Sequence, residues 1–180
     1  MEERQVREGN GRVECDADGA RDVLATLLRA GRSRNGYVYA PAVLEQAVGL
    51  FEGATAFCDH VPAQAAGVGG GRGERLGARG GRSVRDVVGS YRDVRYVDGR
   101  LVGVLRLVDS AIAHLVEQVV HDRRRGLAVP NVGLSADMIV ALSGQADGTR
   151  TVERILKVNS VDVVFDPSAG GAFEDVLEGR

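Results

Sequence analysis

Three polar residues that are far apart in the chain have the chemical types found in a serine hydrolase. His60 follows the small apolar run 54–58. Ser135 lies within a second apolar run, and Asp162 lies within a third. A serine hydroxyl becomes a useful nucleophile when an imidazole takes its proton, and the imidazole works best when an acid fixes its tautomer. The three residues therefore indicate a nucleophile, a base and an acid, each carried by a predicted β-strand or by its end.

Each of the three has an alternative interpretation, because spacing in a sequence does not place residues in space. His60 could simply bond a loop at the end of a strand, and Ser135 could satisfy its hydroxyl within a strand. Asp162 lies among β-branched residues, where a buried carboxylate needs a partner, so it is either paired or turned to solvent. Other serines and acids have similar surroundings: Ser143, Ser160, Ser168, Asp59 and Glu153.

Two further features bear on the site. Gly133 lies just before Ser135, and a glycine there lets another backbone, such as a substrate strand, approach closely. Segment 67–82 is dominated by glycine and arginine and lacks the Gly-Lys-Ser/Thr ending of a phosphate-binding loop. Its low apolar content predicts a flexible loop or a lid over a substrate groove.

Length and composition favour a single soluble, intracellular domain. The chain has 180 residues, a hydrophobic fraction of 44% and a formal charge of −2, which argues against a general nucleic-acid binder. Its longest apolar stretches are too short to cross a bilayer, and its charged start is unlike a signal peptide. Cys15 and Cys58 are too few for a disulfide framework or a zinc site, and no metal or cofactor is expected.

The apolar patterns predict helices interleaved with a larger number of strands. A charged arm, 1–18, precedes apolar residues at helical spacing over 23–28, which predict a first helix. Pro41 begins a second helix, and 110–125 forms a third, with His114 and His121 opposite its apolar stripe. Strands are predicted at 36–40, 54–58, 84–88, 91–97, 101–107, 131–142, 151–158 and 161–165. The predicted fold class is α+β, a mostly antiparallel β-barrel flanked by helices.

With these residues identified, the chain resembles the prohead (head maturation) proteases of tailed bacteriophages, a group related to herpesvirus assemblin. The segments that carry the resemblance are Tyr37 to Phe51, Phe51 to His60, Ser83 to Gly89, Val132 to Ser135, and Val158 to Gly171. The resemblance divides the chain into an N-terminal arm and helix, 1–32, and a protease domain, 33–180. It implies that His60 and Ser135 are catalytic and that Asp162 is the third member.

The resemblance also implies a biological role. The expected activity is that of a serine endopeptidase that cleaves scaffold and major capsid protein segments, and also its own chain, inside the immature head in the host cytoplasm. The family fold, herpesvirus-protease-like, is a β-barrel surrounded by helices. Self-association into a homo-oligomer stays open, and the end at 178–180 suggests a longer precursor or a fused scaffold region.

Two rival functions use the same residues differently. A non-catalytic capsid-assembly module would keep the fold and bind scaffold or shell without cleaving it. An esterase or acyltransferase would use the same nucleophile on another substrate. Turnover of peptides compared with esters separates these possibilities from a peptidase.

Overall fold

The computed structural model describes residues 21–60, 82–144 and 149–177. In this part of the chain it contains two β-sheets and two α-helices, and a short 3-10 turn, Val84–Asp86, precedes β5. The strands are β1 (Arg21–Arg29), β2 (Gly31–Arg32), β3 (Tyr37–Tyr39), β4 (Thr55–Phe57), β5 (Val87–Val97), β6 (Arg100–Leu107), β7 (Val132–Gly144), β8 (Arg150–Phe165) and β9 (Ala172–Leu177). The helices are α1 (Pro41–Phe51) and α2 (Ser110–Arg124).

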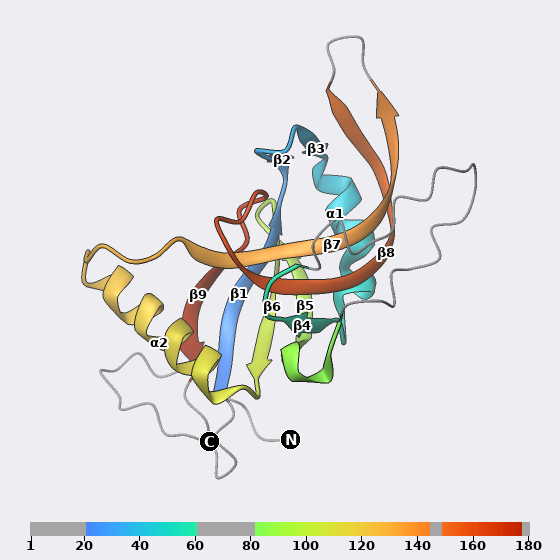
Figure 1. The fold of residues 1–180 in the computed structure, drawn as a ribbon. Helices are drawn as coiled ribbons and strands as arrows, with labels where there is room; N and C mark the ends of the chain where they lie inside the picture. The colour runs from blue at the N-terminus through green and yellow to red at the C-terminus, as the bar shows by residue number, and fades with distance from the viewer. Residues whose placement is uncertain (1–20, 61–81, 145–148, 178–180) are drawn as a thin grey trace, which may run out of the picture.

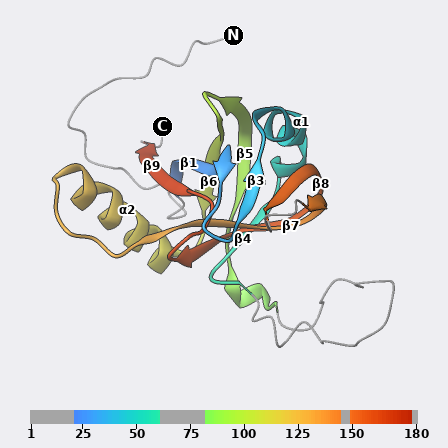
Figure 2. The same ribbon diagram turned by 90° about the horizontal axis from the view of Figure 1, so that it is seen from above.

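The strands form two sheets that face each other across a shared core. The first sheet has the order β4-β5-β6-β1-β9 and the second has the order β2-β3-β8-β7. Neighbouring strands are antiparallel except for β3 and β8, which are parallel. The long ribbon of β7 and β8 crosses one face of the first sheet (Figures 1 and 2). The described chain is therefore mostly β with two helices, and its strand pairing is mostly antiparallel, as expected.

The predicted barrel is not closed. Over the described residues, the two sheets are joined by single bridges, one between Cys58 and Val163 and one between Leu134 and Gly171. Hydrogen-bonded pairing is therefore interrupted at both corners, unlike the continuous pairing that removes all edges in a barrel. Both bridges lie next to predicted site residues, so the corners where the sheets meet are also where the site forms.

The helix predicted over 23–28 is wrong. These residues form β1, which lies between β6 and β9. Of the apolar residues at helical spacing, Val23, Leu27 and Leu28 are buried in this inner strand and Leu24 is half-buried. Such a short apolar run does not distinguish a buried strand from a helix. β1 packs in the same core as the strands and helices that follow it. The predicted arm 1–18 lies outside the described residues.

The other elements agree with expectation in kind, with differences in extent. The two strands predicted at 151–158 and 161–165 are one continuous strand, β8, and 84–88 becomes a 3-10 turn followed by β5. β2 and β9 were not predicted at all. The dipeptide Asp147-Gly148 predicts a turn between two of the strands. This turn and most of the glycine-rich segment, 67–81, lie outside the described residues.

The two helices cover different parts of the core. α1 packs on β5, β6 and β8, burying Leu44, Ala47 and Phe51. It extends two residues beyond Gly49, although a glycine at that position predicts a helix end. α2 packs on β9 and β6, and the Asp109 carboxylate caps it by accepting a hydrogen bond of 2.8 Å from the Ile112 N–H. Neither described helix has the length and apolar character needed to span a membrane.

Candidate active site

His60 is held over the second sheet by the turn that ends β4. The Asp59 N–H donates to the Val163 carbonyl at 2.9 Å, and Asp59 itself has a φ of 60°. This left-handed conformation is unusual for a residue with a side chain, but aspartate tolerates it better than most. The turn redirects the chain after Cys58, so the His60 side chain reaches across to Asp162 on β8.

The pairing of β7 and β8 brings the predicted nucleophile and acid together. Ser135 is the register partner of Asp162 in this antiparallel pair. Residues directly opposite each other project on the same face with Cβ atoms about 4.5–5.5 Å apart. A shift of one residue in this register would turn one of the two side chains to the other face. The register therefore places Ser135 and Asp162 in one site although they are far apart in sequence.

The His60 imidazole contacts the Asp162 carboxylate directly. His60 Nδ1 lies 2.6 Å from Asp162 Oδ2, with Asp162 fully buried and the His60 side chain 40% exposed. A carboxylate on Nδ1 fixes the ring orientation and leaves Nε2 as the nitrogen available to accept a proton. The predicted acid is therefore the one that contacts His60, while Glu153 is exposed on β8 and Asp59 contributes backbone contacts.

The ionisation of Asp162 reflects two opposing effects. Burial alone would raise the pKa of this carboxyl group, since a charged oxygen loses its hydration. Hydrogen bonds from His60, Arg82 and Ser160, together with the positive charge of Arg82, outweigh burial, and the net pKa lies below the usual value. Asp162 is therefore a carboxylate at neutral pH, as a group that stabilises an imidazolium must be.

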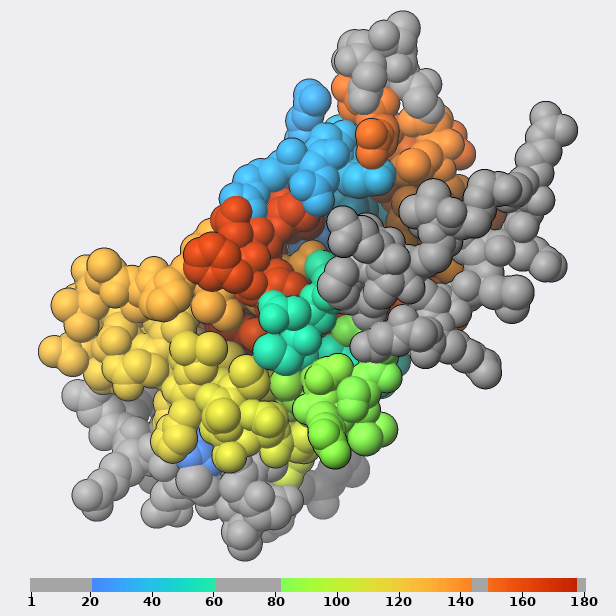
Figure 3. Space-filling model, viewed as in Figure 1, coloured from blue at the N-terminus to red at the C-terminus, as the bar shows by residue number. Residues whose placement is uncertain are grey.

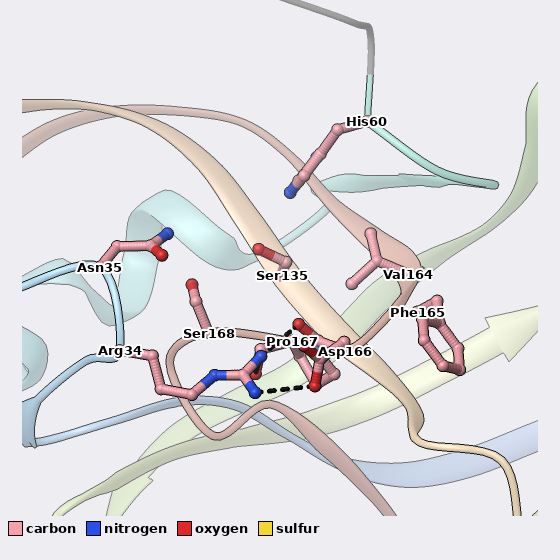
Figure 4. A pocket seen from close by; sticks show the side chains of 9 residues that line it. All are labelled: Arg34, Asn35, His60, Ser135, Val164, Phe165, Asp166, Pro167 and Ser168. Atoms are coloured by element: carbon pink, nitrogen blue, oxygen red, sulfur yellow. Dashed lines mark hydrogen bonds and ion pairs between the residues drawn. The ribbon is translucent and has the colours of Figure 1, made fainter.

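Ser135 and His60 line one cavity. It has a volume of about 380 Å³, and its other lining residues are Arg34, Asn35, Val164, Phe165, Asp166, Pro167 and Ser168. The cavity opens on the face seen in Figure 3, where the segments around residues 34, 60 and 167 meet at the surface. Figure 4 shows the Ser135 hydroxyl and the His60 ring projecting into the same space from different elements. Among the hydrogen bonds of the described residues, His60 bonds Asp162 and has none to Ser135, so a substrate or a small ring movement must complete that contact.

Two glycines let the wall of this cavity lie against β7. A Cβ on Gly133 would lie 2.5 Å from the Gly171 carbonyl oxygen and 2.8 Å from Pro167 Cγ. A Cβ on Gly171 would lie 2.1 Å from the Leu134 carbonyl oxygen. The backbone expected to approach Gly133 is therefore the chain's own 167–171 segment, and the close approach sets the position of the turn beside Ser135.

Arg34 ties that turn to the β2–β3 connection. Its guanidinium donates to Asp166 Oδ1 at 2.7 Å and to the carbonyls of Asp166 and Pro167, and its N–H donates to the Ser168 carbonyl. The hydrogen bond from Arg34 lowers the pKa of the Asp166 carboxyl group, helped by Asn131. Asp166 has a φ of 59°, a conformation that neighbouring contacts must hold in place. Arg34 thus shapes one wall of the cavity without contacting Ser135 or His60.

We expect Arg34→Ala to lower kcat/KM by about 10- to 100-fold, because a displaced wall misplaces the substrate by a fraction of an ångström to an ångström. The melting temperature should hardly change, since exposed ion pairs contribute little to stability. Peptide turnover and thermal unfolding of the same protein samples measure both effects. Arg34→Lys keeps the charge without the two-pronged geometry and should fall between wild type and alanine. Turnover equal to that of wild type in Arg34→Ala would contradict this role for the turn.

The remaining sequence candidates lie elsewhere or have other partners. His114 and His121 are exposed on α2, as their position opposite the apolar stripe predicted, although Leu115 of that stripe is itself 39% exposed. Ser143 lies near the far end of β7, and Ser160 is buried and accepts from Arg82. Ser168 lines the cavity beside Ser135.

Two arginines of the site were missed by sequence reasoning. Arg82 falls at the end of a segment that its composition marks as a loop, and Arg34 lies in a short connection without a motif. A signal was available for Arg82: Ser83 and Asp86 form a capping box, which marks the start of ordered structure directly after it. The connection at Arg34 carries no comparable signal.

Comparison with known proteins supports the fold. No protein-family model matches the chain, and no curated protein matches it either. Among solved structures, the chain is similar to the bacteriophage T4 capsid assembly protease, gp21, with a TM-score of 0.52 and 17% sequence identity. The match covers 81% of this chain and 82% of that one. At this identity the likeness shows a shared fold, that of a phage protease.

Proposed function

We propose that the protein is a serine endopeptidase that cleaves scaffold and capsid-protein segments during the maturation of a phage head. The observation that carries the proposal is the 2.6 Å contact between the buried Asp162 and His60, whose ring shares one cavity with Ser135. The similarity of fold to a capsid assembly protease supports this choice among the hydrolases. A relation to herpesvirus assemblin stays a prediction from the sequence.

The proposed mechanism follows from the arrangement of the three side chains. His60 Nε2 accepts the proton of the Ser135 hydroxyl as Oγ attacks the scissile carbonyl carbon. Asp162 stabilises the imidazolium that forms, and His60 then gives its proton to the departing amine. Water, activated by the same imidazole, hydrolyses the acyl-enzyme and regenerates the Ser135 hydroxyl. Each step uses a contact or a shared cavity described above. The proton taken from Ser135 leaves with the amine, and the attacking water supplies, through His60, the proton that restores the Ser135 hydroxyl.

The proposed substrates are segments of the scaffold and the major capsid protein, together with exposed segments of the protease chain itself. Enclosure of enzyme and substrates inside an assembling head would raise their effective concentration. A shallow site with modest affinity for any one sequence would then suffice. An open cavity lined by both charged and apolar residues is consistent with such a site.

The first test is labelling by a fluorophosphonate, which reacts with an activated serine, followed by peptide mapping. We expect the label on Ser135 in the wild-type protein and none in Ser135→Ala or His60→Ala. Ser143→Ala is the matched control, because it removes the same hydroxyl from the same strand outside the cavity. Labelling of Ser168 instead would show that the wrong hydroxyl has been assigned.

The second test separates the rival functions. Purified protein is incubated with the scaffold and major capsid proteins of the phage that encodes it, and fragments are identified by mass spectrometry. Cleavage that Ser135→Ala abolishes supports the peptidase. Labelling without cleavage, with turnover of simple esters only, would favour an esterase. Head assembly that proceeds equally well with Ser135→Ala, and without cleavage, would favour a non-catalytic assembly module.

A further inference from the structure

Arg82 contacts the candidate site through several hydrogen bonds and an aromatic ring. Its Nη2 donates to Asp162 Oδ2 at 2.7 Å and to Ser160 Oγ at 2.9 Å, and its Nη1 donates to the Asp59 carbonyl at 3.3 Å. Its guanidinium carbon lies 4.1 Å from the centre of the Phe57 ring. The side chain is only 19% exposed. Arg82 thus joins β8 to the segment that carries His60.

These contacts supply the buried Asp162 carboxylate with a positive charge that a neutral histidine cannot supply. A fully buried carboxylate is unstable without a partner of opposite charge. A histidine that accepts a serine proton does so from its neutral form, and a neutral imidazole offers a carboxylate a hydrogen bond but no positive charge. An arginine side chain stays protonated at every pH at which the protein would work. Arg82 can therefore keep Asp162 ionised whether or not His60 carries a proton.

We infer that Arg82 is a positioning residue, which holds Asp162 ionised and oriented toward His60 and so makes His60 competent as a base. It contacts neither Ser135 nor the cavity in which a substrate would react. Its carboxylate partner, Asp162 Oδ2, is the same oxygen that His60 Nδ1 contacts. The catalytic part of this inference rests on the proposed function, whereas the effect on Asp162 does not.

The charged and titratable groups around Asp162 come from several elements. His60 approaches from the end of the β4 turn, and Arg82 from the start of the β5 segment. Tyr91 on β5 donates to the Val161 carbonyl, and burial, with the charge of Asp162, raises the pKa of its phenol well above the usual value. Asp137 on β7 lies 3.8 Å from Arg82 and competes weakly for it. Over the described residues, Arg82 is the permanent positive charge in contact with Asp162.

The sign of the pH dependence follows from the direction of the Asp162 shift. A carboxyl group whose pKa is lowered by folding stabilises the protein above its ordinary pKa, and this stabilisation is lost as pH falls through the lowered value. Without Arg82, burial would raise the pKa of Asp162 with less opposition. The destabilisation caused by Arg82→Met should therefore be largest near neutral pH and should shrink in acid, once Asp162 is protonated.

The experiment is urea unfolding of four proteins across acidic to neutral pH: wild type, Arg82→Met, Asp162→Asn, and the double variant. We expect Arg82→Met to lower the urea concentration at the unfolding midpoint, by an amount that shrinks as pH falls. In the Asp162→Asn background, we expect the same substitution to lower the midpoint only slightly and equally at every pH. A loss that is the same at every pH and in both backgrounds would overturn the inference, since it would show that Arg82 only packs on Phe57. Should Arg82→Met fail to fold, Arg82→Lys is used in the same cycle, with a smaller effect of the same pH dependence.

Turnover provides the second measurement. Arg82→Met should lower kcat about 10- to 100-fold, the range seen when outer partners of functional histidines are removed from metal sites, with Arg82→Lys restoring part of the loss and KM little changed. Arg124→Met is the control, because it removes a surface ion pair with Asp175 far from the cavity. One outcome is that the stability loss of Arg82→Met depends on Asp162 while the wild-type protein shows no peptidase activity. That result would keep the positioning role of Arg82 and overturn the proposed function. Wild-type kcat in both Arg82 variants would overturn the inference and leave the proposed function intact.

Discussion

Ser135→Ala and His60→Ala should each lower the rate of peptide cleavage by about 10⁴–10⁶, with little further loss when they are combined. The reason is that nucleophile and base act as one unit: an alkoxide cannot form without the imidazole, and the imidazole has nothing to activate without the hydroxyl. Single-turnover cleavage of a capsid-protein peptide measures all three variants. Asp162→Ala should cost less than either, since it removes the orientation of the base rather than the base itself.

The control is Ser143→Ala, which should cleave at the wild-type rate. If the cleavage rate of the double variant fell by about the product of the two single fold-losses, Ser135 and His60 would act independently and would not share a proton. Circular dichroism of each variant excludes loss of fold as the cause of lost activity. Ser135 is half-buried and His60 is partly exposed, so neither substitution should disturb the core.

Gly171→Ala should destabilise the protein by about 3 kcal/mol, at the upper end of the cost of overpacking. The added Cβ would lie 2.1 Å from the Leu134 carbonyl oxygen, and both atoms in this contact belong to rigid parts of the chain. Relief requires the 167–171 segment to move away from β7, which also opens the cavity wall next to Ser135. The expected fall in melting temperature is roughly 6–12 °C for a domain of this size, measured by calorimetry.

The matched control makes the same substitution where there is room. Gly49 lies on the exposed side of α1 with no other atom within 4 Å of an added Cβ. Gly49→Ala should therefore stabilise the protein by about 0.5–1 kcal/mol, through the better helix propensity of alanine. A Gly171→Ala protein as stable as wild type would contradict the close approach of the 167–171 segment to β7.

Several elements could be predicted because their signals are local. Pro41 at the first turn and Asp109 at the cap identify the two helices, and Asp98-Gly99 identifies the β5–β6 hairpin. β1 could not be predicted correctly, because a strand buried on both faces loses the alternation that distinguishes a strand from a helix. The corner joining β7 to Gly171 depends on long-range pairing, which no local pattern encodes, and a closed barrel was expected where single bridges occur.

The residues of the candidate site likewise fall into those that the sequence predicted and those that it did not. His60, Ser135 and Asp162 could be proposed from residue type and resemblance. The structure places His60 and Ser135 on one cavity, with the buried Asp162 in contact with His60. The catalytic roles stay a prediction until the variants are measured. The two arginines could not be proposed, because an arginine in a loop has the same local sequence whether it contacts solvent or a buried carboxylate. What distinguishes Arg82 is the partner that folding brings to it, 80 positions later in the chain.

The order of these residues along the chain has a consequence for when the protein could first act. The base arrives early in synthesis, whereas the acid and the segment that packs on β7 arrive only at positions 162 and 171. A nascent chain that has not reached them lacks both the partner of His60 and one wall of the cavity. Hydrolytic competence would therefore appear abruptly and late, after nearly all of the described fold has been made. Such timing would spare the ribosome-bound chain from premature cutting.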